Sequence, residues 1–118
     1  MQYLLLIYHS EIDWGRLSPA QQEVIYREYR DLIQELAASG QLIRGDQLKP
    51  ASAATTVRLR NGNTDRIDGP FAETKEQVGG YFLVKVKTLD EALKIAARIP
   101  SARDGAIEVR EVIPTQKD

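Results

Sequence analysis

Residues 16–40, which read RLSPAQQEVIYREYRDLIQELAASG, decide the fold of this chain. Ser18 is a natural N-cap, and Pro19 takes the first helical position, where its missing N–H costs nothing. Gln21 completes a Ser-x-x-Gln capping box, and Gly40 suits the left-handed backbone that ends many helices. Apolar side chains between these ends recur at helical spacing and form one stripe: Ile25, Tyr29, Leu32, Ile33, Leu36 and Ala37. The stretch therefore predicts one long amphipathic helix.

The segments that flank this helix have strand-like patterns. Before it, residues 3–8 (YLLLIY) form a short apolar run that is typical of a central strand. After it, residues 41–48 (QLIRGDQL) predict a short extended piece that is broken at Gly45. A hairpin follows in residues 55–68, with its turn at Asn61-Gly62-Asn63, because an Asn-Gly pair tolerates positive φ.

The C-terminal half predicts a strand, a second helix and a last strand. Residues 79–87 (GGYFLVKVK) alternate in their second half and predict a strand, and the paired glycines at its start predict a bulge or a close backbone approach. Thr88 and Glu91 form a second capping box, and Pro100 ends the helix that follows. The apolar face of that helix is expected to consist of Leu89, Ala92, Leu93, Ala96 and Ile99. Residues 106–113 (AIEVREVI) alternate again and close the chain as a strand.

This order of elements defines an α+β fold. A strand, a long helix, hairpin elements, a strand, a shorter helix and a final strand make up the ferredoxin-like split βαβ pattern with an antiparallel sheet. Both helices cover one face of such a sheet, so the other face is open and carries apolar side chains. A second copy of the chain is the simplest cover for that face, and we expect a homodimer.

Composition limits the classes of function. The 118 residues predict a single domain over residues 1–118, and the absence of cysteine excludes disulfides and thiolate chemistry. Sixteen basic and seventeen acidic residues give a net charge of −1, so there is no basic field for direct nucleic-acid binding. The N-terminal apolar run is too short to cross a membrane and has no cleavage signal, and we expect a cytoplasmic protein. No metal-ligand spacing or phosphate loop stands out, and no cofactor is expected.

Residues 68–76 (DGPFAETKE) allow two interpretations. In the first, Asp68 forms an Asx turn, Gly69 frees the backbone before Pro70, and Phe71 pins the loop to the core. In the second, the segment is longer than a hairpin needs and gathers carboxylates, one of which acts as an acid, a base or a ligand contact. The second interpretation makes Asp68 the main candidate.

The same residues carry a resemblance to a known family. The stretch DGPFAETKEQVGGYFLVKVKTLDEALKIAARIP, together with YLLLIYHSE, ELAASGQLIRGDQLKP, ATTVRLRNG and GAIEVREV, closely resembles the DGPF group of the YCII-related family over essentially the whole chain. The resemblance implies a dimeric α+β barrel and an activity that is largely undefined. It also implies, for some relatives, an association with extracytoplasmic-function sigma factors. The wider family is proposed to use a His–Asp pair.

This chain departs from that pair. Its single histidine is His9, after the first strand, and the position of the family's helix histidine falls near Tyr29. A tyrosine is a poor base at neutral pH, so the imidazole chemistry of the wider family does not transfer. His9 is a secondary candidate, because imidazole is an acid–base group near neutral pH, although it is expected in a polar loop. Tyr29 is expected mainly in the core, and Tyr26 at the edge of a helix–sheet cleft.

We therefore predict a cleft for a small polar ligand around the DGPF loop. Asp68 would contact the ligand or act as acid or base, and the supporting candidates are His9, Tyr26, Tyr29, Phe71, Glu73 and Lys75. Whether the chain is an enzyme or a binding module stays open. The alternative is an accessory protein that binds a sigma factor, and a cofactor-free monooxygenase is a third idea from fold analogy alone.

Overall fold

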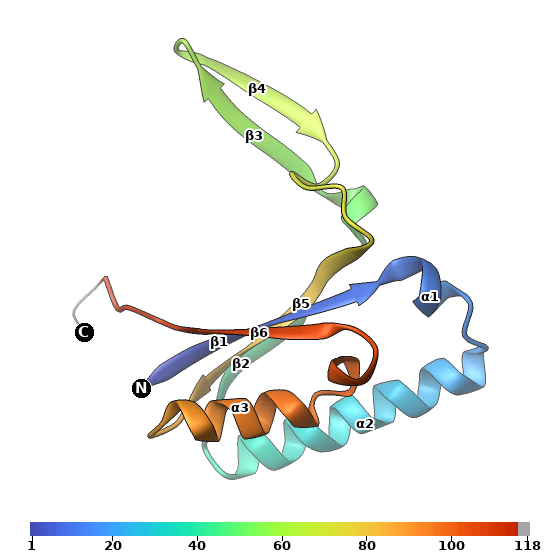
Figure 1. Cartoon of the computed structure of the whole chain (residues 1–118), viewed down its shortest axis with the longest axis vertical. Helices are drawn as coiled ribbons and strands as arrows, with labels where there is room; N and C mark the ends of the chain where they lie inside the picture. Colours follow the sequence, from blue (N-terminus) through green and yellow to red (C-terminus); the bar gives the residue numbers. More distant parts are fainter. Residues whose placement is uncertain (116–118) are drawn as a thin grey trace.

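A computed structural model describes residues 1–115 of the chain. Its main sheet has four antiparallel strands in the order β2-β5-β1-β6, with β1 at Gln2–Ser10, β2 at Leu42–Gln47, β5 at Glu76–Lys85 and β6 at Ala106–Glu111. The long helix α2 (Pro19–Ala38) and the shorter α3 (Leu89–Arg98) lie on the same side of this sheet (Figure 1). The expected α+β, ferredoxin-like arrangement is confirmed.

The long helix begins as its sequence predicts. The Ser18 hydroxyl accepts a hydrogen bond from the Gln21 N–H at 3.1 Å, and the Gln21 side chain accepts one from the Ser18 N–H at 2.9 Å. Gly40, at φ +77°, adopts the left-handed conformation just past the end of α2. The helix is thus fixed at both ends by local chemistry, before any packing is considered.

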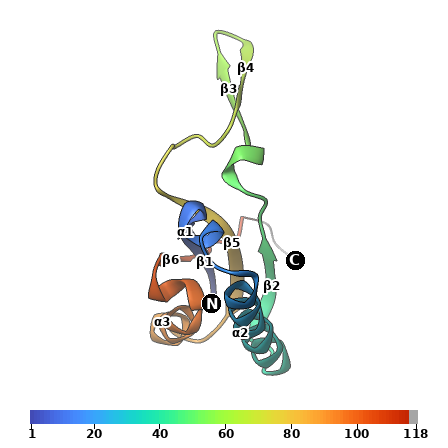
Figure 2. The same ribbon diagram turned by 90° about the vertical axis from the view of Figure 1, so that its right-hand side faces the viewer.

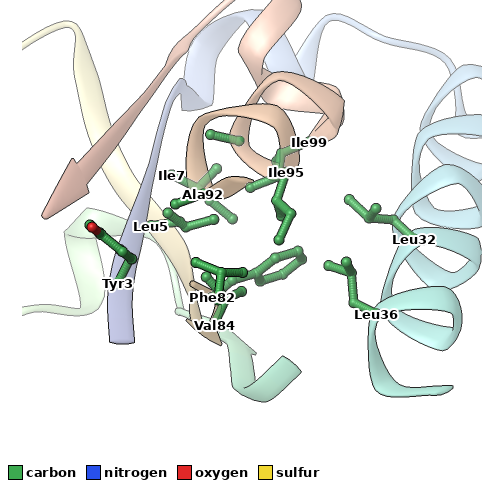
Figure 3. Close-up of a cluster of buried hydrophobic side chains, with 12 residues drawn as sticks. Tyr3, Leu5, Ile7, Leu32, Leu36, Phe82, Val84, Ala92, Ile95 and Ile99 are labelled. Atoms are coloured by element: carbon green, nitrogen blue, oxygen red, sulfur yellow. The ribbon is translucent and has the colours of Figure 1, made fainter. Parts of the chain in front are cut away.

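The core lies between the sheet and the two helices. Tyr3, Leu5 and Ile7 alternate along β1 and point toward the helices, because successive side chains on a strand face opposite sides. Phe82 and Val84 do the same on β5. These side chains meet residues from both helices in one cluster (Figure 3): Leu32, Leu36, Ala92, Ile95, Ala96 and Ile99.

Several details of the expected pattern are wrong. Gly45 does not break its strand; a Cβ there would stand 2.8 Å from Phe82 Cδ1, so the glycine lets the ring pack against β2. Ala37 is exposed. On α3, Ile95 is buried, whereas Leu89 and Leu93 lie at the exposed edge of the helix.

The second expected capping box is incomplete. Thr88 accepts a hydrogen bond from the Glu91 N–H at 3.2 Å, as an N-cap should. However, the Glu91 carboxylate accepts from the N–H of Lys87 at 2.8 Å and not from that of Thr88. The helix still begins where the sequence predicts, because the N-cap bond is present.

The segment between β2 and β5 forms an arm that projects from the body (Figures 1 and 2). After the 3₁₀ turn η1 (Ala51–Ala53), strands β3 (Thr55–Arg60) and β4 (Asn63–Asp68) pair only with each other and form a separate two-stranded sheet. The predicted turn is confirmed, since Asn61 and Gly62 have φ of +51° and +79°. We call residues 55–75, the hairpin and the loop that returns from it, the arm.

Candidate ligand-binding cavity

A cavity of about 400 Å³ opens at the end of the sheet from which the arm leaves. Its walls come from α1 (Glu11–Gly15), from α2 and from the ends of β1, β2 and β5. Most of the lining is apolar, with four aromatic rings and several aliphatic side chains: Trp14, Tyr26, Tyr29, Phe82, Ile7, Ile25, Ile33 and Leu48. The volume and the apolar lining are those of a site for a small organic molecule.

His9 is one of the polar residues of the cavity lining, which also include Glu11, Arg30, Asp46, Gln47, Lys49 and Ser101. It lies near the end of β1 and is half-buried in the cavity lining. The expectation of a polar loop at His9 is wrong, because β1 continues to Ser10 and α1 follows at once. Among the described residues, neither ring nitrogen of His9 takes part in a hydrogen bond within the chain. By contrast, Ser10 accepts from the Asp13 N–H at 3.2 Å, and Glu11 accepts from the Ala51 N–H at 2.6 Å.

Gly79 makes room for the imidazole. The register of β1 and β5 shifts between Ile7, which pairs with Gly80, and Tyr8, which pairs with Val78, so Gly79 is the extra residue of a β-bulge. A Cβ at Gly79 would stand 2.3 Å from His9 Nε2, which is far inside contact distance. The paired glycines were expected to mark a bulge or a close backbone approach, and the structure has both. The close approach brings the backbone of β5 against the His9 ring.

Tyr29 is part of the wall and is held in place by the core. Its hydroxyl lies 2.7 Å from the Ser101 hydroxyl, and its ring meets Phe82 edge to face, with 6.3 Å between ring centroids. Burial raises the pKa of Tyr29 above its ordinary value. At neutral pH Tyr29 is therefore a neutral hydrogen-bonding group and not a base.

Tyr26 is a partly exposed residue of the cavity lining, and it packs against a residue from an element that the sequence did not predict. Trp14 belongs to α1, and its ring meets that of Tyr26 edge to face, with 5.3 Å between centroids. Gln22 donates to the Trp14 carbonyl at 3.1 Å, which ties α1 to α2. The five-residue α1 could have been found from Ser10, an N-cap residue that stands three positions before Asp13.

The candidates from the DGPF segment lie outside this cavity. Asp68 ends β4 on the exposed arm, opposite Thr55, and Phe71 stacks on the Arg58 guanidinium at 4.7 Å in a shallow hollow of the arm. Lys75 reaches only Asp13, with 4.0 Å between Nζ and Oδ2. Glu73 is exposed on the same loop. Within one chain the structure does not bring these residues to His9, and their roles stay predictions.

The DGPF segment itself is a joint at the base of the arm. Gly69 has φ +108°, a conformation that other residues rarely adopt. Its N–H donates to the Ala54 carbonyl at 2.7 Å, and its carbonyl accepts from the Thr56 hydroxyl at 2.9 Å. These two bonds fasten the returning chain to the start of β3. The expected Asx turn at Asp68 and the expected contact of Phe71 with the core are wrong, because the bonds in the described residues come from the backbone of Gly69 and Phe71 is 72% exposed.

Two further properties concern the described residues only. Residues 1–115 contain no group of three or more histidine, cysteine or acidic side chains that could hold a metal ion. In the same range, no helix is both long enough and apolar enough to cross a membrane.

The fold and the cavity define a class: an α+β protein with a ferredoxin-like sheet and a small-molecule-sized cavity at the strand ends. Residues 1–116 match the YCII-related domain, and the chain belongs to that family. It is similar to an uncharacterised protein of Rhizobium meliloti (strain 1021), with 37% identity over 112 residues that cover 93% of this chain and 90% of the relative.

Proposed function

We propose that this protein binds a small, mainly apolar molecule in the cavity, with a hydrogen-bonding group of that molecule facing His9. One observation carries the proposal: a mainly apolar cavity of about 400 Å³ is lined by an imidazole that has no hydrogen-bond partner among the described residues. Binding sites of this kind combine a large apolar wall with a few polar groups that fix orientation. This site replaces the expected cleft around the DGPF loop as the best-supported location.

His9 also determines which reaction the site could support. A ligand hydroxyl or carbonyl in hydrogen-bond distance of the imidazole can exchange a proton with it, so acid–base chemistry on that group is the natural extension. Tyr29 and Ser101 also line the cavity, and their hydroxyls already bond each other. We propose binding, and any catalysis in this cavity would require the same contact between His9 and the ligand.

Because His9 is the only histidine of the chain, all imidazole signals in an NMR spectrum come from this residue. We would titrate the protein with 2-naphthol and with 2-methylnaphthalene, two probes of similar shape of which only the first can hydrogen-bond, and follow the imidazole signals by NMR. We expect 2-naphthol to bind about 2- to 13-fold more tightly, the range that one hydrogen bond supplies. In His9→Phe, which keeps a ring but loses both nitrogens, the preference should disappear. Equal binding of both probes to the wild type would contradict the proposal.

We further propose that two copies of the chain associate through the open face of the sheet. Five partly exposed apolar side chains form a strip along its centre: Leu4, Leu6, Tyr8, Tyr81 and Leu83. Ion pairs flank this strip on both sides, Glu108 with Arg110 on β6 and Arg44 with Asp46 on β2. An apolar strip edged by paired charges suits a self-complementary two-fold contact.

The mass in solution tests this association. Light scattering should give twice the chain mass of 13.3 kDa for the wild type, and the chain mass for Leu6→Glu, which would bury an unpaired charge in the contact. A Leu6→Glu protein that stays dimeric would contradict pairing through this face. Assignment to the DGPF group, a ligand contact by Asp68 and an association with a sigma factor stay predictions that rest on the resemblance.

A further inference from the structure

The arm has no core of its own within the chain. All six residues of β4 are exposed, and the strands of the arm pair only with each other. An isolated two-stranded hairpin is marginally stable in water at best. The bonds of Gly69 fasten its base, but nothing in the described chain packs against the tip of the hairpin (Figure 2).

The two faces of the arm differ. Residues directly opposite each other in an antiparallel pair share a face, so the register assigns every side chain. One face is partly covered by its own chain, because Phe71 lies over Arg58. The other, which we call the arm face, consists of Thr55, Val57, Leu59, Thr64, Arg66 and Asp68. On it, Val57 is 62% exposed and Leu59 is 72% exposed, with nothing packed against them.

The exposed area of the chain is larger than that of a compact monomer, which indicates that a partner surface is missing. The chain exposes 8641 Å², whereas a compact monomer of 13.3 kDa exposes about 6,500 Å². Its radius of gyration is 16.3 Å, against about 13.5 Å for a compact domain of this length. The surplus of roughly 2,000 Å² exceeds the ~800 Å² per partner of a standard interface and suits a homodimer in which an arm is also covered.

We infer that the arm face packs against a second copy of this chain, so that two copies clasp each other. The inference rests on the pairing proposed above and adds a second contact to it. A two-fold exchange buries both arms at once and leaves none free, so the assembly closes. Charge favours a second copy as the occupant: the arm face carries one cation, Arg66, and one anion, Asp68, and a net charge of −1 per chain gives little repulsion between copies.

The inference also predicts where the exposed Asp68 lies in the dimer. Asp68 lies on the arm face, two positions from Arg66 and across from Thr55. In a clasped pair its carboxylate would lie in the contact between copies. Asp68 would then be a contact residue between the two copies, and it would need no catalytic role.

The test compares the two faces of the arm. Leu59→Glu puts a carboxylate on the arm face, and Asn63→Glu puts the same charge on the opposite face at the same end of the hairpin. Neither residue belongs to the core, so both variants should keep the circular dichroism spectrum of the wild type. By analytical ultracentrifugation we expect Leu59→Glu to weaken dimerisation roughly tenfold or more, since it loses an apolar contact and buries a charge. Asn63→Glu should change it less than about twofold.

Cross-linking identifies the molecule that packs against the arm face. Because the chain has no cysteine, Leu59→Cys and Asn63→Cys each accept a single photo-reactive maleimide. In a mixture of ¹⁴N- and ¹⁵N-labelled protein, the label at position 59 should give mixed-isotope dimers and the label at position 63 few or none. Equal effects of the two glutamates, or cross-links from position 59 only within one chain, would overturn the inference and leave pairing through the sheet face intact. A monomeric wild type would overturn both, while binding of 2-naphthol would still test the cavity by itself.

Discussion

Replacement of Gly79 by alanine separates the role of the cavity from the stability of the fold. The added Cβ would stand 2.3 Å from His9 Nε2 and 2.6 Å from Cδ2. Ordinary van der Waals contact starts near 3.4 Å, so the imidazole must move away by about 1 Å. This displacement is larger than the spread of donor–acceptor distances in hydrogen bonds, so the bond between His9 and the ligand is lost. We therefore expect Gly79→Ala to lose the preference for 2-naphthol, a drop of about 2- to 13-fold in affinity, while 2-methylnaphthalene binds almost as before.

The fold should tolerate this change. A displaced His9 costs about 0.5–1.5 kcal/mol, and replacement of a strand glycine offsets about 0.4–1 kcal/mol by lowering the entropy of the unfolded chain. Stability should thus stay within about 1 kcal/mol of the wild type. Gly105→Ala is the contrasting control, because its Cβ would stand 2.1 Å from the backbone carbonyl oxygen of Tyr8, which cannot move aside. That variant should lose about 2 kcal/mol or more.

The assays are thermal unfolding, probe titration and the NMR signals of the single histidine. If Gly79 acts only through His9, the double variant with His9→Phe should bind 2-naphthol no more weakly than His9→Phe does. The reasoning is refuted if Gly79→Ala keeps both the preference for 2-naphthol and the imidazole shifts of the wild type.

Three other variants test the fold and its electrostatics. Leu36→Ala empties a site that is 1% exposed and should lower the free energy of unfolding by about 2–5 kcal/mol in a urea titration; a loss below 1 kcal/mol would contradict the assigned core. Gly69→Ala places a side chain at φ +108° and should speed hydrogen exchange in the arm while the sheet stays protected; unchanged arm exchange would contradict its role as a joint. Arg103 donates two hydrogen bonds to Glu28, at 2.7 and 2.8 Å, and these bonds lower the pKa of Glu28. This stabilisation is present above the pKa of the unfolded chain and is lost as pH falls through the folded value. Glu28→Gln should thus cost less than about 1 kcal/mol at pH 7, and this cost should shrink as the pH falls and Glu28 becomes protonated; a difference that stays constant as the pH falls would contradict the pair.

The main elements could be predicted because local chemistry fixes their ends. The Ser18 cap, Gly40 and the Asn61-Gly62 turn act within a few residues, and alternation along the strands identifies the buried face. The wrong prediction at Gly45 depended on a residue that is far away in the sequence. The pattern predicts a break at Gly45 because the contact that requires a glycine there, the ring of Phe82, belongs to a strand that follows much later.

The site was harder to predict than the fold. The sequence drew attention to the conspicuous DGPF segment, whose residues lie on the arm. Without α1, the sequence pattern predicts that His9 lies in a loop and not in the wall of a cavity, so His9 is only a secondary candidate. The paired glycines predict a bulge, but only the structure shows that Gly79 lies against the His9 ring, because the register pairs His9 itself with Gln77.

The packing of Trp14 gives the protein a built-in optical reporter. It is the only tryptophan of the chain, and it forms part of the cavity wall beside Tyr26. Excitation at the red edge of indole absorption therefore selects one fluorophore, whose emission depends on what occupies the neighbouring space. A guest that displaces water from this wall should shift the emission to shorter wavelength, so unlabelled protein can be screened against chemical libraries in a plate reader.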